Sequence, residues 1–123
     1  MTVRAWLSVD IGTSSVKAAA IGEDGALLSE GRAPVGLYRG ADEREYESEP
    51  REWLAGLRAA IGLAVAGSGG AEFRALSVSG NGPTLVPCDR AGEPLGRALS
   101  WMDRRAHDEA ERVSTLAGVP LDP

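Results

Sequence analysis

The fold is decided by the stretch Leu7-Ser8-Val9-Asp10-Ile11-Gly12-Thr13-Ser14-Ser15-Val16-Lys17. It begins inside an apolar run, Ala5 to Ile11, that is short enough for a buried strand. Turn residues follow from Gly12 to Ser15, and a second strand-like run extends from Val16 to Ile21. The stretch therefore predicts a β-hairpin that carries a carboxylate, that of Asp10, at the end of its first strand.

The predicted turn has the chemistry of a phosphate site. A glycine lets backbone approach a ligand closely, and turn N–H groups and hydroxyls are donors suited to phosphate oxygens. The residues concerned are Gly12, Thr13, Ser14 and Ser15. Lys17 lies two residues after Ser15 and therefore on the same face of the second strand, where it can meet a terminal phosphate.

Asp10 is the candidate ligand for Mg²⁺, through water, because protein-bound Mg²⁺ keeps much of its hydration shell. On spacing alone, a plain β-hairpin with a polar turn stays open as the alternative, since glycine and serine abound in turns. A P-loop is excluded, because the chain has no G-x-x-x-x-G-K-[ST] stretch and a strand rather than a helix follows the turn.

Beyond the hairpin, the pattern predicts a third strand, a helix and a fourth strand. Asp24-Gly25 favours a tight turn before a strand from Ala26 to Ala33. The polar segment from Pro34 to Pro50 is predicted to be a surface loop, and helical spacing of apolar residues follows from Pro50 to Val65. A strand is expected from Phe73 to Ser79. The fold class is therefore α/β, with a three-stranded antiparallel meander followed by helix and strand, which is how the ribonuclease-H-like fold begins.

Two helices are predicted in more detail. The apolar stripe of the first is expected to be Trp53, Leu54, Leu57, Ile61, Ala64 and Val65. Gly56 and Gly62 cost helix propensity and are expected to let this helix lie close to a sheet. The second helix is predicted from Asp103 to Ala117, with Gly118 just past its end.

Composition narrows the class of protein. The chain has 123 residues and a mass of 12.8 kDa, which suits one small domain. Its net charge of -5, without a basic cluster, argues against nucleic acid or an anionic membrane as a partner. No run approaches the roughly 20 apolar residues of a bilayer span. Cys88 is the only cysteine, which excludes an intrachain disulfide and indicates a reducing cytoplasm.

The hairpin stretch Asp10-Ile11-Gly12-Thr13-Ser14-Ser15-Val16-Lys17 resembles the phosphate-1 signature of FGGY-family carbohydrate kinases, such as xylulokinase, gluconokinase and glycerol kinase. The resemblance implies the actin/Hsp70-like ATPase fold, in which this aspartate handles Mg²⁺ and the hydroxyl hairpin contacts the phosphates of ATP. Actin-like ATPases share the motif, so another member of that superfamily, such as a chaperone or a filament protein, stays an alternative.

Two further stretches are similar to the same family. Glu45-Tyr46-Glu47-Ser48-Glu49-Pro50-Arg51-Glu52-Trp53 resembles its aromatic-x-Glu-x-Asp-Pro-x-x-Trp segment, with Glu49 in place of the aspartate. The run from Gly92 to Ala106 resembles Gly-x-Pro-Leu-x-x-Ala-Ile-x-Trp-x-Asp-x-Arg-Ala, which implies that Trp101 and Asp103 lie on the sugar side. Local roles stay open: Asp103 is also well placed as a helix N-cap, with Arg105 merely paired to it.

The segment Gly80-Asn81-Gly82-Pro83 lies where xylulokinase-like members carry a Gly-Gln-Met-His loop that lines the sugar pocket. The resemblance makes Asn81, Gly82 and Pro83 substrate-side residues, while their identities put xylulose in doubt. Glycerol is disfavoured as well, since the arginine–glutamate pair of glycerol kinases is missing. Asn81 is the candidate for a substrate hydrogen bond, with a left-handed turn residue as the alternative.

The resemblance implies ATP-dependent phosphorylation of a sugar or polyol hydroxyl, with ATP and Mg²⁺ as cofactors and a homodimer as one assembly of the full-length enzyme. Residues 1–123 would form a truncated N-terminal kinase domain, because the family's catalytic aspartate, in a Gly-Gly-x-Asp-like segment, has no counterpart here. The chain alone is therefore expected to be inactive, and a non-catalytic sugar- or nucleotide-binding fragment stays an alternative. His107 is expected to be a surface residue.

Overall fold

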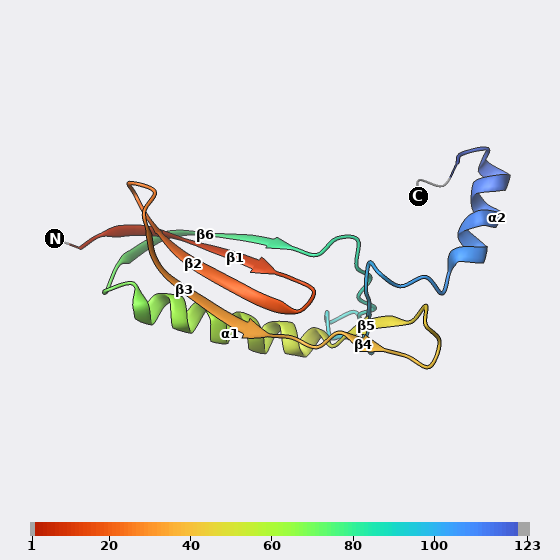
Figure 1. Cartoon of the computed structure of the whole chain (residues 1–123), viewed down its shortest axis with the longest axis horizontal. Coiled ribbons are helices and arrows are strands. Elements are labelled where there is room, and N and C mark those ends of the chain that lie inside the picture. Colours follow the sequence, from red (N-terminus) through yellow and green to blue (C-terminus); the bar gives the residue numbers. More distant parts are fainter. Residues whose placement is uncertain (1, 121–123) are drawn as a thin grey trace.

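The computed structural model describes residues 2–120 as two β-sheets and two helices (Figure 1). The larger sheet has the strand order β3-β2-β1-β6. Its strands are β1 (Arg4–Ile11), β2 (Ser15–Gly22), β3 (Leu27–Pro34) and β6 (Glu72–Gly80). The first three form an antiparallel meander, and β6 pairs in parallel with β1. The predicted α/β order is confirmed, whereas the predicted domain of residues 1–123 extends beyond the described residues at both ends.

Helix α1 (Pro50–Gly67) covers one face of this sheet and makes the crossover that brings β6 parallel to β1 (Figure 1). The core between them is built from Leu7, Val9, Val16, Ala18, Ala33, Val35, Ala60 and Ala64. At Gly56 a Cβ would lie 3.1 Å from Val35 Cγ1 and 3.3 Å from Val16 Cγ2, so this glycine does bring helix and sheet together. At Gly62 a Cβ would meet nothing within 4 Å, so the same expectation is wrong there.

The predicted apolar stripe of α1 is only partly correct. Leu54 and Val65 are exposed, and the helix residues buried against the sheet are Gly56, Ala60 and Ala64. The large side chains Trp53, Leu57 and Ile61 are only partly buried beside that contact. A helix that approaches a sheet this closely has room for small residues at the centre of the contact, so large ones lie at its margins.

The second sheet consists of β4 (Tyr38–Arg39), β5 (Tyr46–Ser48) and β7 (Ala98–Leu99), all antiparallel. The predicted surface loop from Pro34 to Pro50 is therefore wrong where β4 and β5 form, and Ser48 in β5 is buried. These strands are too short to show a period in the sequence. They exist because β5 pairs with a segment some 50 residues later, a contact that no local pattern reveals.

Helix α2 (His107–Ala117) begins four residues later than predicted, and no residue in it is buried. It lies apart from the larger sheet and from α1 (Figure 1). Its N-cap residue is Ala106, without a side-chain hydrogen bond, so the interpretation of Asp103 as the N-cap is wrong. Gly118 closes the helix at φ 65°, in the left-handed region, as predicted. Within residues 2–120, neither helix has the length and apolar character that crossing a bilayer requires.

Candidate functional site

Asp10 lies at the end of β1, with its side chain about half exposed at 51%. It faces Lys17 across the hairpin, and Lys17 Nζ lies 4.0 Å from Asp10 Oδ2. The turn between them closes through the N–H of Gly12, which donates to the carbonyl of Ser15 at 2.9 Å. A Cβ at Gly12 would lie 2.8 Å from that same carbonyl oxygen, so only glycine fits the turn in this form.

The tip of the hairpin offers donors that the fold does not use. Among the described residues, the N–H groups of Thr13 and Ser14 donate no hydrogen bond, although the Ser14 carbonyl accepts one from Val35. Adjacent unpaired N–H groups on a turn form an anion-binding concavity. Ser15 differs from its neighbours, because it is only 4% exposed and lies largely beneath the turn.

Three segments far apart in the sequence meet at Thr13. Its hydroxyl Oγ1 donates to Asn81 Oδ1 at 3.3 Å, and Trp101 Nε1 donates to the same hydroxyl at 3.3 Å. The backbone N–H of Asn81 also donates to the carbonyl of Ile11 at 3.0 Å. Asn81 has no positive φ, so its interpretation as a left-handed turn residue is wrong. The structure thus brings the predicted phosphate turn into contact with the predicted sugar-side residues.

An open groove of about 440 Å³ runs beside this contact. It is lined by Pro83, Thr84, Leu85, Leu99, Ser100, Trp101, Asp103 and Ala106. Trp101 is 49% exposed and offers its ring to the groove. Gly82 is exposed, and the peptide bond between Gly82 and Pro83 is cis. A Cβ at Gly82 would meet no other atom within 4 Å.

Asp103 is held in place by several donors. Its carboxylate accepts from the N–H of Tyr46 at 3.0 Å and from the N–H of Arg105 at 3.0 Å. The guanidinium of Arg105 also binds it at 2.9 Å, and reaches Glu47 Oε1 at 2.9 Å. Burial opposes ionisation, but these hydrogen bonds outweigh it and hold the pKa of Asp103 below its ordinary value. The interpretation that Arg105 pairs with Asp103 is therefore correct.

Asp103→Asn is expected to lower the free energy of unfolding by about 2 kcal/mol, because an amide replaces the charged acceptor of these hydrogen bonds. The folded pKa lies below the unfolded one, so the carboxylate stabilises the fold above the unfolded value of about 3.9. That stabilisation is lost as the pH falls through the folded pKa. The difference between wild type and variant should shrink below about pH 4, measured by urea unfolding. A difference independent of pH contradicts this role.

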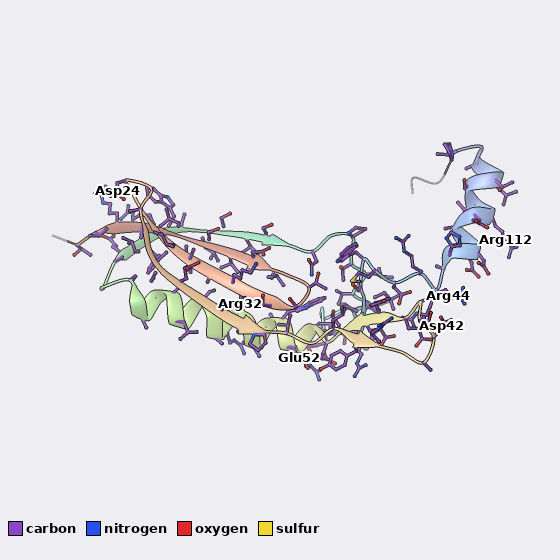
Figure 2. The ribbon with its side chains drawn as sticks, viewed as in Figure 1. Asp24, Arg32, Asp42, Arg44, Glu52 and Arg112 are labelled. Carbon is purple, nitrogen blue, oxygen red and sulfur yellow. The ribbon has the colours of Figure 1, made fainter. Side chains whose placement is uncertain are left out.

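Sequence reasoning missed a second set of contacts that ties α1 to the small sheet. Glu52 on α1 accepts from the Gly36 N–H at 2.8 Å and from the Tyr38 hydroxyl (Figure 2). The hydrogen bond to Glu52 raises the pKa of Tyr38, and the Arg97 guanidinium lies 3.9 Å from the centre of the Tyr38 ring. Arg97 also lies 3.8 Å from Glu47. These contacts join residues 14 to 59 positions apart, so no local spacing could have indicated them.

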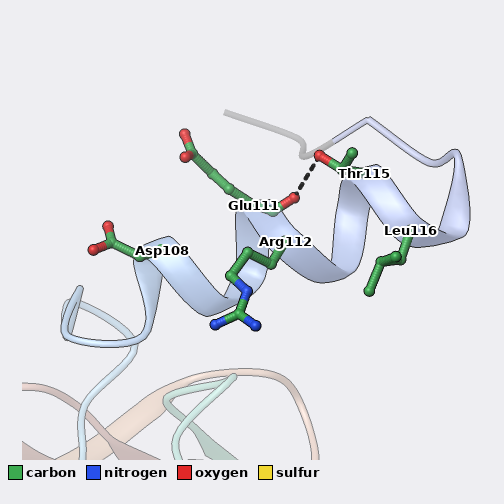
Figure 3. Close-up of a pocket in the computed structure, with 5 residues that line it drawn as sticks. All are labelled: Asp108, Glu111, Arg112, Thr115 and Leu116. Carbon is green, nitrogen blue, oxygen red and sulfur yellow. Dashed lines mark hydrogen bonds between the residues drawn. The ribbon is translucent and has the colours of Figure 1, made fainter.

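The side chains of α2 line a separate hollow (Figure 3). It is formed by Asp108, Glu111, Arg112, Thr115 and Leu116, with the Thr115 hydroxyl donating to the Glu111 carbonyl at 2.9 Å. None of the predicted site residues lines it. His107, at the start of the same helix, is exposed as predicted and lies 3.2 Å from Glu111. The candidate site is therefore the hairpin and the groove beside Trp101.

A metal ion at this site would depend on Asp10. Within residues 2–120, no group of three or more histidine, cysteine, aspartate or glutamate side chains is arranged to hold one. A single exposed carboxylate at a strand end fits Mg²⁺, which is commonly bound through one or two carboxylates, substrate phosphates and water. It does not fit zinc, which takes three or four protein ligands.

Comparison with known proteins places these residues in a family. Residues 5–120 match the N-terminal domain of the FGGY family of carbohydrate kinases. The chain belongs to this family. It is 35% identical to the xylulose kinase of Streptomyces coelicolor over 115 residues, and 31% identical to the glycerol kinase of Coxiella burnetii over 116 residues. Each alignment covers 92% of this chain but 23% of the relative.

The solved structures agree on the fold. A xylulose kinase from Brucella ovis superposes with a TM-score of 0.84 at 23% identity, over 94% of this chain and 24% of that one. The predicted resemblance and the predicted actin/Hsp70-like fold are thereby confirmed. The chain spans about a quarter of the length of the relatives it matches.

Proposed function

We propose that this chain supplies the phosphate-side turn and part of the sugar-side wall for ATP-dependent phosphorylation of a sugar or polyol hydroxyl. The observation that carries the proposal is the pair of hydrogen bonds joining Thr13 to Asn81 and Trp101. Phosphoryl transfer requires the acceptor hydroxyl to lie in line with the terminal phosphate, at near-contact distance. A phosphate turn and a sugar loop that share a hydrogen bond hold the two reactants close together.

On the phosphate side, the turn supplies donors and positive charge. The N–H groups of Thr13 and Ser14, which donate no hydrogen bond among the described residues, would bind phosphate oxygens, and Lys17 would neutralise charge on the terminal phosphate. Gly12 keeps the turn tight enough for this approach. Ser15 takes part through the backbone, because its side chain is buried.

Asp10 would hold Mg²⁺ through water, at the exposed end of β1. When bound, the ion neutralises charge that develops on the transferring phosphate. Asp10 itself orients the hydrated ion and keeps Lys17 near the same phosphates through their 4.0 Å contact. It is not the base that deprotonates the acceptor, and no residue of this chain is assigned to that step.

On the sugar side, Trp101 forms an apolar wall for sugar carbons, and Asn81 hydrogen-bonds a hydroxyl through the amide nitrogen that Thr13 leaves free. Gly82 and Pro83 shape the loop between them. Asp103 serves indirectly, by fixing the segment that carries Trp101 to the small sheet. We place the activity in the cytoplasm, because Cys88 is exposed and cannot pair within the chain.

A chimera tests the proposal. Residues 5–120 would replace the matched quarter of the Streptomyces coelicolor xylulose kinase, and ATP consumption would be followed with a panel of pentoses, hexoses and polyols. Turnover with at least one of them is expected, whereas the 123-residue chain alone should consume no ATP. A folded chimera that turns over none of the panel refutes the proposed function. Turnover by the 123-residue chain alone would contradict the proposal that this chain supplies only part of the active site.

Thr13 provides the sharpest variant in this chimera. Thr13→Val keeps the shape of the side chain but removes the hydroxyl, so Trp101 Nε1 and Asn81 Oδ1 both lose a partner. Sugar affinity should fall roughly tenfold, the cost of a broken hydrogen bond. Thr13→Ser keeps the hydroxyl and should bind the sugar like wild type. Equal affinities for both variants would mean that the shared hydroxyl does not position the sugar side.

A further inference from the structure

Trp101 lies in a turn that is attached to the central strand of the small sheet, β5. The turn runs from Ser100 to Asp103 and closes through the Asp103 N–H, which donates to the Ser100 carbonyl at 2.9 Å. Both ends of the turn bind Tyr46 on β5. The Ser100 N–H donates to the Tyr46 carbonyl at 2.9 Å, and the Tyr46 N–H donates to the Asp103 carboxylate at 3.0 Å. The position of the Trp101 ring at the groove is therefore set by β5.

Glu47, the next residue of β5, binds the chain on both sides of this turn. Its carboxylate oxygen Oε1 lies 2.9 Å from Arg105 Nη2, and its Oε2 lies 3.8 Å from Arg97 Nη1. Arg97 lies four residues before Trp101 in the sequence, and Arg105 lies four residues after it. One carboxylate thus holds both the segment that enters the turn and the segment that leaves it.

The contacts of Glu47 are partly shielded from water and join side chains that the fold already orders. Exposed ion pairs contribute little, because water screens them and two mobile side chains must be held in one geometry. Here the Glu47 side chain is 26% exposed and that of Arg105 is 34% exposed. Arg105 is also held by Asp103, and the Arg97 guanidinium is also held by the Tyr38 ring. The entropy lost in forming the Glu47 contacts is therefore small.

We propose that Glu47 is a positioning residue for Trp101, which fixes the turn so that the ring meets the sugar carbons. The inference rests on the proposed function, in which Trp101 forms the apolar wall of the sugar site. Glu47→Gln removes the charge between the two guanidiniums but keeps the size of the side chain. An amide has one oxygen, so it accepts from one guanidinium and turns its N–H donors toward the other. The turn should then loosen and the ring should lose its fixed position.

Steady-state kinetics of the chimera tests this role, with the sugar that it turns over best. Glu47→Gln should raise the sugar KM roughly fivefold, the effect of one hydrogen bond to a charged group, with kcat and the KM for ATP unchanged. Glu72→Gln is the matched control, since it breaks a 2.7 Å pair with Arg74 at the other end of the larger sheet and should leave the sugar KM unchanged. An unchanged sugar KM for Glu47→Gln, or an equal rise in the KM for ATP, overturns the role of Glu47 in an active chimera. An inactive chimera refutes the proposed function instead.

A double-mutant cycle separates positioning from a general loss of structure. Trp101→Ala removes the wall, so in that background Glu47→Gln should weaken sugar binding no further, measured by calorimetric titration, which needs no turnover. Equal weakening in both backgrounds would mean that Glu47 does not act through Trp101, and would overturn the proposal.

Arg105→Lys is the second variant, and it keeps the test decisive if Glu47→Gln does not fold. An ammonium keeps the charge but lacks the planar fork that binds both Glu47 and Asp103. The sugar KM should again rise roughly fivefold, and the effect should again vanish in the Trp101→Ala background. A wild-type sugar KM for Arg105→Lys, or an effect that persists without the Trp101 ring, contradicts the proposal.

Discussion

Gly31→Ala is expected to destabilise the fold by about 3 kcal/mol. A Cβ at Gly31 would lie 2.0 Å from the carbonyl oxygen of Ala60 and 2.9 Å from Leu63 Cβ. The first of these atoms belongs to the backbone of α1, which no rotamer change can move aside. The helix must therefore lift away from β3 and loosen the core around Ala60, which is fully buried.

Gly62→Ala is the matched control, because it adds the same methyl group to α1 itself rather than to the strand beneath it. A Cβ at Gly62 meets nothing within 4 Å, so the variant should gain helix propensity and become more stable by about 1 kcal/mol. Urea unfolding of both variants, with the midpoint compared at unchanged slope, measures the two effects. If Gly31→Ala were as stable as wild type, α1 would not lie as close to β3 as the structure has it.

The glycines inside α1 show what the sequence alone cannot predict. Gly56 and Gly62, inside α1, have the same local signature, a helix-weakening residue in an amphipathic segment. Only the sheet beneath decides which one is needed, and Val16 and Val35 lie under Gly56 alone. The same holds for Leu54 and Val65, which follow the helical period yet lie outside the contact with the sheet.

The candidate site, too, could be predicted from the sequence only in part. The Asp10 hairpin was predictable because its chemistry is local: a strand end, a glycine and the donors of one turn lie within eight residues. The contact of Thr13 with Trp101, 88 positions away, was not, and neither was the bond of Arg105 to Glu47. Motif resemblance indicated which residues belong to the site, but their mutual contacts depend on how two sheets and a helix meet.

The role of Asp103 illustrates what resemblance alone leaves open. The sequence offered two interpretations, a substrate-side residue and a helix cap. In the structure its carboxylate is 9% exposed and engaged by Tyr46 and Arg105. Asp103 lines the groove, but its carboxylate oxygens accept hydrogen bonds from Tyr46 of the small sheet and from Arg105. A residue that matches a family motif can therefore support a site without itself binding the substrate.

Asp10→Asn is expected to lower kcat/KM of the chimeric kinase roughly a thousandfold, about 4 kcal/mol of transition-state stabilisation. The amide keeps the size of the side chain but loses the charge that would hold hydrated Mg²⁺ against the phosphates. The fold should tolerate the change, because the carboxylate is 51% exposed and its contact with Lys17 is long, at 4.0 Å. Stability and activity are thus expected to separate at this residue.

Asp24→Asn is the matched control for that change. Asp24 also lies in a hairpin turn of the same sheet, between β2 and β3, but at the end of the sheet away from the groove (Figure 2). Within the described part of the chain, its carboxylate accepts a single hydrogen bond, from the N–H of Ala26, so turnover should stay at the wild-type level. The decisive measurement is the dependence of rate on Mg²⁺ concentration. If Asp10→Asn kept both the wild-type rate and the wild-type Mg²⁺ dependence, the metal would have to be held elsewhere, and the phosphate site proposed at this hairpin would lose its basis.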